Sequence, residues 1–296
     1  MGNILTKQFY RQRKDFEDSC AGRDAGLTFP EGVRCSTDIA YADDGIKAHV
    51  LDIYRPEDSQ EKILPVIINV HGGGLIIGNK EFNRYFCALL CKKGFLVYSI
   101  EYRLIPDCLI YDQIADVFMA MDYIKERLAA DGGDSSHVYM AGDSGGACLI
   151  TYVNAIQNST NIARAANVTP SGLRINALGL ISGMFYTSRF DKIGLFLPKY
   201  LYGRDYKKTS FAKYVNPENR ELLNSLAPVW LVTSHNDFLR RYTTDFEKAL
   251  TRAEREHELV VFPKNKKLTH AFSVFEPYMP ESSAVIDMMV EYLRKF

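Results

Sequence analysis

The chain has 296 residues, 47% of them hydrophobic and 24% charged, which is the balance of a soluble globular protein with a large core. Its 36 Lys and Arg residues are matched by 36 Asp and Glu residues, so the charge does not support a nucleic-acid-binding protein, which needs a basic surplus or a basic stripe. No apolar run approaches the roughly 18 residues of a transmembrane helix, and the N-terminus lacks the apolar core of a secretory signal. We therefore expect a cytoplasmic protein.

The first part of the chain, residues 1 to 34, is charged and only weakly periodic. We expect a partly helical N-terminal arm that forms part of a cap over the main domain. Gly2 and Thr6 match the M-G-x-x-x-[ST] myristoylation pattern, but five loosely specified positions do not decide whether Gly2 carries a lipid. The 6 cysteines contain no C-x-x-C pair, so we expect free, buried thiols and no metal site.

Next come two strand-like runs, residues 35–41 and 49–54, separated by a stretch that contains Asp44-Gly45, and this pattern predicts a β-hairpin. After Pro65, short apolar runs alternate with stretches of helical periodicity. The expected strands lie at 66–70, 95–100, 138–141, 175–181, 229–234 and 259–262, and the expected helices at 82–92, 113–130, 148–156, 243–256 and 283–296. This alternation predicts an α/β fold with a mostly parallel sheet covered by helices on both faces.

One segment, residues 183 to about 223, interrupts the alternation and is far longer than an ordinary crossover loop. It is rich in aromatic residues. We predict a small helical insertion over the carboxyl edge of the sheet, which is where ligands bind in open α/β sheets. Its aromatic side chains are expected to line the substrate site, with additional core packing as the alternative.

The pentapeptide Gly142-Asp143-Ser144-Gly145-Gly146 matches G-x-S-x-G and lies between a short strand and an apolar helical stretch. This is the strand–turn–helix setting of a nucleophile elbow, in which a tight turn pushes a serine hydroxyl out of the sheet. Small residues must surround the serine so that the neighbouring backbone does not clash. The pattern predicts Ser144 as a nucleophile, with a purely structural glycine-rich turn as the alternative.

A second motif, His71-Gly72-Gly73-Gly74, directly follows an expected strand. The tetrahedral intermediate of acyl transfer needs preorganised N–H donors, and glycines leave backbone N–H groups open to a cleft. We expect Gly73, Gly74 and Gly145 to form this oxyanion hole, whereas Gly72 is a less certain donor that shapes the turn. His71 is expected to brace the loop. The spacing of a phosphate-binding loop is absent.

A base for Ser144 should come late in the chain, because the partners of an elbow serine follow it in the order acid, then histidine. Three histidines follow the serine: His235, His257 and His270. Only His270 lies in a loop after the last expected strand, from which it can reach the serine. His257 precedes that strand and should face the opposite edge of the sheet.

The acid should follow the expected strand 229–234, and Asp237 does so. An ionised carboxylate there would hold the imidazole in one tautomer and stabilise the imidazolium ion. Asp245 is the nearest alternative, and we expect it to be solvated on the following helix.

These motifs occur together in a recognisable order. HGGG, Tyr102-Arg103-Leu104, GDSGG, Asp237-Phe238-Leu239-Arg240 and Leu268-Thr269-His270-Ala271-Phe272 have the order and spacing of the hormone-sensitive-lipase-like branch of the α/β-hydrolases. The chain resembles that branch from about residue 35 to its C-terminus. The resemblance implies an α/β-hydrolase fold with about eight strands over residues 35–296, a cap insertion at about 183–223, and no metal or cofactor.

The same resemblance implies a serine carboxylesterase that acts on short acyl esters, with Ser144, Asp237 and His270 as a catalytic triad. Two departures stand out: Ile105-Pro106-Asp107 replaces the frequent Ala-Pro-Glu, and Gly145 replaces the alanine of G-D-S-A-G-G. The alternatives are a small arylformamidase-like amidase and a non-catalytic small-molecule receptor on the same fold. The expected partner is a small-molecule ester, with no nucleic acid, and the sequence leaves a homodimer open.

Overall fold

The computed structural model describes residues 2–59 and 62–296, with side chains from Thr6 onward. Within these residues the centre is an 8-stranded sheet in the order β1-β2-β4-β3-β5-β6-β7-β8. The strands are β1 Val33–Ala40, β2 Val50–Pro56, β3 Leu64–Val70, β4 Leu96–Ile100, β5 Gly133–Asp143, β6 Ala177–Ile181, β7 Val229–Ser234 and β8 His257–Phe262. β2 pairs antiparallel with β1 and β4, and the neighbours from β4 to β8 are parallel, which confirms the predicted fold class.

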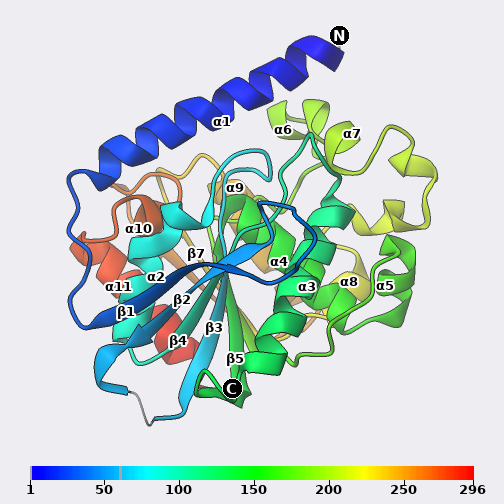
Figure 1. The fold of residues 1–296 in the computed structure, drawn as a ribbon. Coiled ribbons are helices and arrows are strands. Elements are labelled where there is room, and N and C mark those ends of the chain that lie inside the picture. Colours follow the sequence, from blue (N-terminus) through cyan, green and yellow to red (C-terminus); the bar gives the residue numbers. More distant parts are fainter. Residues whose placement is uncertain (1, 60–61) are drawn as a thin grey trace.

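Helices cover both faces of this sheet (Figure 1). They are α1 Gly2–Asp24, α2 Arg84–Lys92, α3 Ile110–Arg127, α4 Ser144–Gln157, α5 Thr160–Ala166, α6 Lys192–Phe196, α7 Pro198–Leu201, α8 Arg220–Asn224, α9 Arg240–Arg252, α10 Phe272–Phe275 and α11 Pro280–Leu293. The alternation of side chains along β3 divides the core between the two faces. Val66 and Ile68 pack in the cluster that contains α3 and α4, whereas Ile67 packs in the cluster that contains α2 and α11.

The predicted hairpin is present as the antiparallel pair β1–β2, but its loop runs from residue 41 to residue 49 and is longer than a two-residue Asp-Gly turn. His49 explains the longer loop, because its ring is buried beneath it. Nδ1 of His49 lies 2.7 Å from Asp44 and Nε2 lies 3.1 Å from the buried Asp116 on α3. The loop therefore closes around an internal imidazole.

The N-terminal arm is more regular than expected, because residues 2–24 form the single helix α1. α1 crosses the molecule at the edge where α6 and α7 also lie (Figure 1). Near its N-terminal end, the ring of Phe9 lies 5.2 Å from that of Tyr200 on α7, and further along, the ring of Phe16 lies 4.9 Å from that of Phe82. None of the described helices is both long enough and apolar enough to cross a bilayer.

Candidate active site

A cavity of about 250 Å³ lies beside Ser144 at the carboxyl edge of the parallel strands. The residues that follow β3, β5 and β7 all reach it, because the carboxyl ends of neighbouring parallel strands meet at one edge. Its lining is Phe16, Gly73, Gly74, Ile77, Phe82, Asp143, Ser144, Met184, Ile193, Phe238, Leu239, His270 and Phe275. The two glycine motifs and two of the three predicted triad members thus share one cavity.

Ser144 is the first residue of α4 and directly follows β5. Its backbone has a φ of +49°, in the left-handed region that side-chain-bearing residues rarely adopt. The segment after β6 stabilises this turn, since the backbone N–H of Met184 donates to the Ser144 carbonyl over 3.0 Å. A strained serine between a strand and a helix is the geometry that the G-x-S-x-G motif predicts.

Asp237 and His270 are in direct contact, with 2.7 Å between Oδ1 of Asp237 and Nδ1 of His270. The carboxylate is buried and accepts two further hydrogen bonds: Leu239 N–H donates to Oδ1 over 2.8 Å, and the Thr233 hydroxyl donates to Oδ2 over 2.8 Å. Burial alone would raise the pKa of Asp237, but the hydrogen bond and charge of His270 and the hydrogen bond from Leu239 outweigh it and hold this pKa below its ordinary value. Asp237 is therefore ionised beside the imidazole at neutral pH.

The loop that carries His270 is held by hydrogen bonds both before and after the histidine in the chain. Ala271 has a φ of +48°, and its N–H donates to Oγ of Ser182 over 3.1 Å. The Ser234 hydroxyl donates to the Leu268 carbonyl, and the ring of Phe238 lies 4.4 Å from the imidazole. Because these contacts come from β7 and from the loop after β6, tertiary packing sets the orientation of the imidazole.

The alternative acid and histidines lie elsewhere. The carboxylate of Asp245, on α9, pairs with Arg189 at 2.9 Å. His257 begins β8, at the opposite edge of the sheet, and lies 3.5 Å from Glu247. His235 is exposed to solvent. Neither the acid nor the two histidines line the cavity beside Ser144.

The glycine loop, which we define as residues 71–77, forms one wall of the cavity. Gly73 and Gly74 have φ values of +105° and +61°, which a residue without a Cβ adopts at little cost. Gly145 packs against this loop so closely that a Cβ on it would lie 2.8 Å from the backbone nitrogens of Gly74 and Leu75. This close approach gives a physical reason for glycine at position 145.

Gly72 differs from the other two glycines of the loop, because its N–H already has an acceptor. It donates to Oδ1 of Asp143 over 3.0 Å, and Asn83 donates to the same oxygen over 2.9 Å. Burial raises the pKa of Asp143, although these hydrogen bonds favour its ionised form. Gly72 thus shapes the turn, and the sequence reasoning missed the Asp143–Asn83 pair that ties the elbow to the glycine loop. Asp143 stood inside the motif, but no sequence signal marked Asn83.

His71 braces the same loop from behind, as expected. Its Nε2 lies 3.0 Å from Oε1 of Glu101, and its ring stacks on Tyr102 at 4.3 Å. Burial would lower the pKa of His71, but the Glu101 carboxylate outweighs it, so this pKa is raised. The Tyr102 hydroxyl also donates to the His71 carbonyl over 2.8 Å. The motif Tyr102-Arg103-Leu104 by itself indicated no role for Tyr102.

The aromatic residues of segment 183–223 do not line the cavity as expected. Among the described residues, this segment contributes Met184 and Ile193 to the lining. Several of its rings pack in the core instead: Phe185 stacks on Phe246 of α9 at 4.2 Å, and Tyr202 hydrogen-bonds to Tyr152 of α4 over 3.0 Å. The aromatic walls come from other parts of the chain, namely Phe16, Phe82, Phe238 and Phe275.

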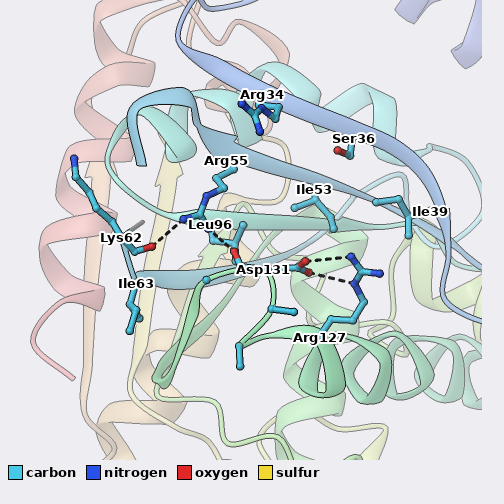
Figure 2. A pocket seen from close by; sticks show the side chains of 13 residues that line it. Arg34, Ser36, Ile39, Ile53, Arg55, Lys62, Ile63, Leu96, Arg127 and Asp131 are labelled. Atoms are coloured by element: carbon cyan, nitrogen blue, oxygen red, sulfur yellow. Dashed lines mark hydrogen bonds and ion pairs between the residues drawn. The ribbon is translucent and has the colours of Figure 1, made fainter. Parts of the chain in front are cut away.

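A larger cavity, of about 620 Å³, lies at the opposite edge of the sheet, where β3, β4 and β5 begin (Figure 2). It contains several cations, but internal partners bind two of them. Arg127 pairs with Asp131 at 3.1 Å, and Arg55 donates to the Lys62 carbonyl over 2.8 Å and to the carbonyls of Ser59 and Asp131. Although it is larger than the first cavity, its lining residues include no nucleophile–base pair, so the cavity beside Ser144 is the candidate active site.

The described residues offer no cluster of three or more His, Cys, Asp or Glu side chains that could hold a metal ion. All 6 cysteines are free thiols. Cys148, on α4, is typical of the buried ones, because burial raises its pKa to about 12. A thiol with such a pKa is a poor nucleophile at neutral pH.

Solved structures with this architecture include several esterases. Esterase B from Lactobacillus rhamnosis is 22% identical, covers 99% of this chain and 95% of its own, and superposes with a TM-score of 0.92. The bacterial heroin esterase is 22% identical, covers 98% of this chain and 92% of its own, and has a TM-score of 0.73. At this level of identity the likeness establishes the fold.

Curated relatives match over shorter stretches. A probable isoprenylcysteine alpha-carbonyl methylesterase from Oryza sativa subsp. japonica is 29% identical over 184 residues, which are 58% of this chain and 44% of that protein. Tuliposide A-converting enzyme b1 from Tulipa gesneriana is 30% identical over 131 residues, 40% of this chain and 35% of that protein. The chain thus spans less than half the length of these relatives. The family model described as alpha/beta hydrolase fold matches residues 67–273, so the protein belongs to the α/β-hydrolase family, in its hormone-sensitive-lipase-like branch.

Proposed function

We propose that this protein is a serine carboxylesterase that hydrolyses short-chain acyl esters, with Ser144 as nucleophile, His270 as base and Asp237 as the acid. One observation carries the proposal: the strained Ser144 and the imidazole that Asp237 holds at 2.7 Å line the same cavity. The esterase names of the relatives and structural neighbours support the same chemistry.

The mechanism follows from which ring nitrogen of His270 is engaged. Nδ1 carries the proton that is shared with Asp237, so Nε2 is free to accept one. Oγ of Ser144 bonds to the ester carbonyl carbon while its proton passes to Nε2, and the carbonyl electron pair moves to the oxygen. The N–H groups of Gly73, Gly74 and Gly145 stabilise this oxyanion. Its collapse breaks the carbon–oxygen bond of the leaving group, which takes the proton from His270, and water then releases the acid from the acyl-enzyme by the same steps.

The cavity supports a short, apolar acyl group. Its volume of about 250 Å³ lies below the roughly 300–1,000 Å³ that is usual for drug-sized ligands. Its walls are largely hydrocarbon and include Phe16 from α1, Phe82, and Met184 and Ile193 from segment 183–223. We propose that α1 and segment 183–223 together form the cap over this site.

Two other functions remain to be tested against the esterase. An arylformamidase-like amidase would use the same Ser144 and His270, because the imidazolium can protonate a leaving amine as well as an alcohol. A receptor on this fold would bind an ester in the cavity without turnover. Parallel assays of esters and matched amides separate all three functions.

The deciding experiment replaces Ser144 by alanine and measures kcat/KM on p-nitrophenyl esters from acetyl to lauroyl. We expect a loss of about 10⁶-fold, as for nucleophile removal in other triad enzymes, with the fold intact. The exposed Ser136, outside the cavity, supplies the matched Ser136→Ala control, which should keep full activity. A folded Ser144→Ala variant with wild-type turnover would overturn the proposal, and a wild type that turns over no ester at any pH would favour the receptor.

A further inference from the structure

Arg13, in the middle of α1, makes an unusually complete set of contacts for a residue on a terminal helix. Its side chain is only 18% exposed, and it pairs with Asp107 at 2.7 Å. Nε donates to the Ile76 carbonyl over 2.8 Å, and Nη2 donates to the carbonyls of Leu104 and Ile105 over 3.0 and 2.6 Å. Three of its acceptors are therefore backbone oxygens, which cannot turn away as a side chain can.

The Ile76 carbonyl belongs to the glycine loop. In that loop the N–H groups of Ile76 and Ile77 both donate to the Gly73 carbonyl, over 3.1 and 3.0 Å. The N–H of Ile105 donates to the carbonyl of Leu75 over 3.0 Å. Arg13 thus bonds to two segments that also bond to each other, and both converge on the turn that begins at Gly73.

We propose that Arg13 is a positioning residue that holds the glycine loop in place from α1. The inference rests on the proposed function, in which the N–H groups of Gly73 and Gly74 stabilise the oxyanion. Such donors are effective only when they are preorganised, because a loop that must reorganise during the reaction loses much of their benefit. The planar fork of a guanidinium can reach several carbonyl oxygens at fixed angles, whereas the ammonium group of lysine acts as a single point charge.

The same helix carries a matched control. Arg23 also ties α1 to backbone oxygens, since Nη2 donates to the Phe82 carbonyl over 2.9 Å and Nη1 to the Val274 carbonyl over 3.4 Å. Neither acceptor lies in the glycine loop. Arg23→Gln should therefore loosen α1 without loosening the loop, which separates the two effects.

The test compares Arg13→Gln, Arg13→Lys and Arg23→Gln, with active sites counted by titration with an organophosphonate. In Arg13→Gln we expect kcat on p-nitrophenyl butyrate to fall about tenfold at unchanged KM, which is less than the roughly 10²–10³-fold loss on removal of an oxyanion donor. Arg13→Lys should recover part of kcat, and Arg23→Gln should keep it. Hydrogen–deuterium exchange of the peptide that covers residues 72–78 should rise in Arg13→Gln and stay unchanged in Arg23→Gln.

Equal kcat values and equal exchange in Arg13→Gln and Arg23→Gln would overturn the proposal, because Arg13 would then only anchor α1. If Arg13→Gln does not fold, Arg13→Lys decides in the same way. A wild type without ester turnover would refute the proposed function instead. In that case the exchange of residues 72–78 still shows whether Arg13 holds the loop.

Discussion

Replacing Asp237 by asparagine separates the charge of this carboxylate from its hydrogen bonds. Oδ1 of Asp237 accepts from His270 and from the N–H of Leu239, whereas Oδ2 accepts from the Thr233 hydroxyl. The N–H of Leu239 can only donate, so it selects the amide oxygen of an asparagine for that side. The Thr233 hydroxyl can rotate and accept from the amide NH₂ group. Asp237→Asn should therefore keep His270 in its productive tautomer and lose only the negative charge.

The expected loss follows from that charge alone. Unit charges about 4 Å apart interact by about 4 kcal/mol at an effective dielectric constant of about 20. Since about 1.4 kcal/mol corresponds to a tenfold change in rate, kcat/KM should fall about 10³-fold. An asparagine that forces the wrong tautomer costs about 10⁴-fold in a triad enzyme, so the two cases differ measurably.

The assay is kcat/KM on p-nitrophenyl butyrate, with the folded concentration measured by circular dichroism. Asp245→Asn is the control and should be active, because Asp245 pairs with Arg189 and does not line the cavity. A loss of about 10⁴-fold or more would refute the argument from Leu239 and Thr233. Near-normal activity of Asp237→Asn together with an inactive Asp245→Asn would show that the acid is wrongly assigned.

Three further substitutions test neighbouring parts of the site. Gly145→Ala should lower kcat, because its Cβ would lie 2.8 Å from the nitrogens of Gly74 and Leu75 and displace the glycine loop. An unchanged kcat would mean that the loop can shift without loss of activity. Phe16→Ala should enlarge the cavity and raise the ratio of kcat/KM for decanoyl to that for butyryl esters, and an unchanged ratio would remove α1 from the substrate site. Burial raises the pKa of Asp143, so the unfolded chain ionises at lower pH than the folded one and the carboxyl costs stability as pH rises through that window. Asp143→Asn should therefore melt at a higher temperature than the wild type at neutral pH, with the difference closing in acid. A difference in melting temperature that does not change across this pH range would contradict the argument.

Much of the fold could be predicted from local patterns. A strand that is buried on both faces needs a nearly continuous apolar run, and residues 66–70 provide one that lies in β3. The elbow needs small residues around a serine at the end of a strand, and this requirement is met within the five residues around Ser144. Asp237 and His270 follow the neighbouring strands β7 and β8, so strand order predicts that they lie at the same edge of the sheet, and in the structure their side chains are 2.7 Å apart.

The sequence by itself thus determined the alternation of strands and helices, the elbow and the candidate triad, because each depends on residues near in the chain or on strand order. Only the tertiary structure decided which groups share the cavity. Phe16 reaches it from α1, and Arg13 on the same helix bonds to the glycine loop. Their contacts with Phe82 and Ile76 join parts of the chain more than 60 residues apart. Several aromatic side chains of segment 183–223, among them Phe185 and Tyr202, pack in the core instead. Composition cannot distinguish a ring that lines a cavity from one that packs beneath it, because both are apolar and only the packing of distant elements separates them.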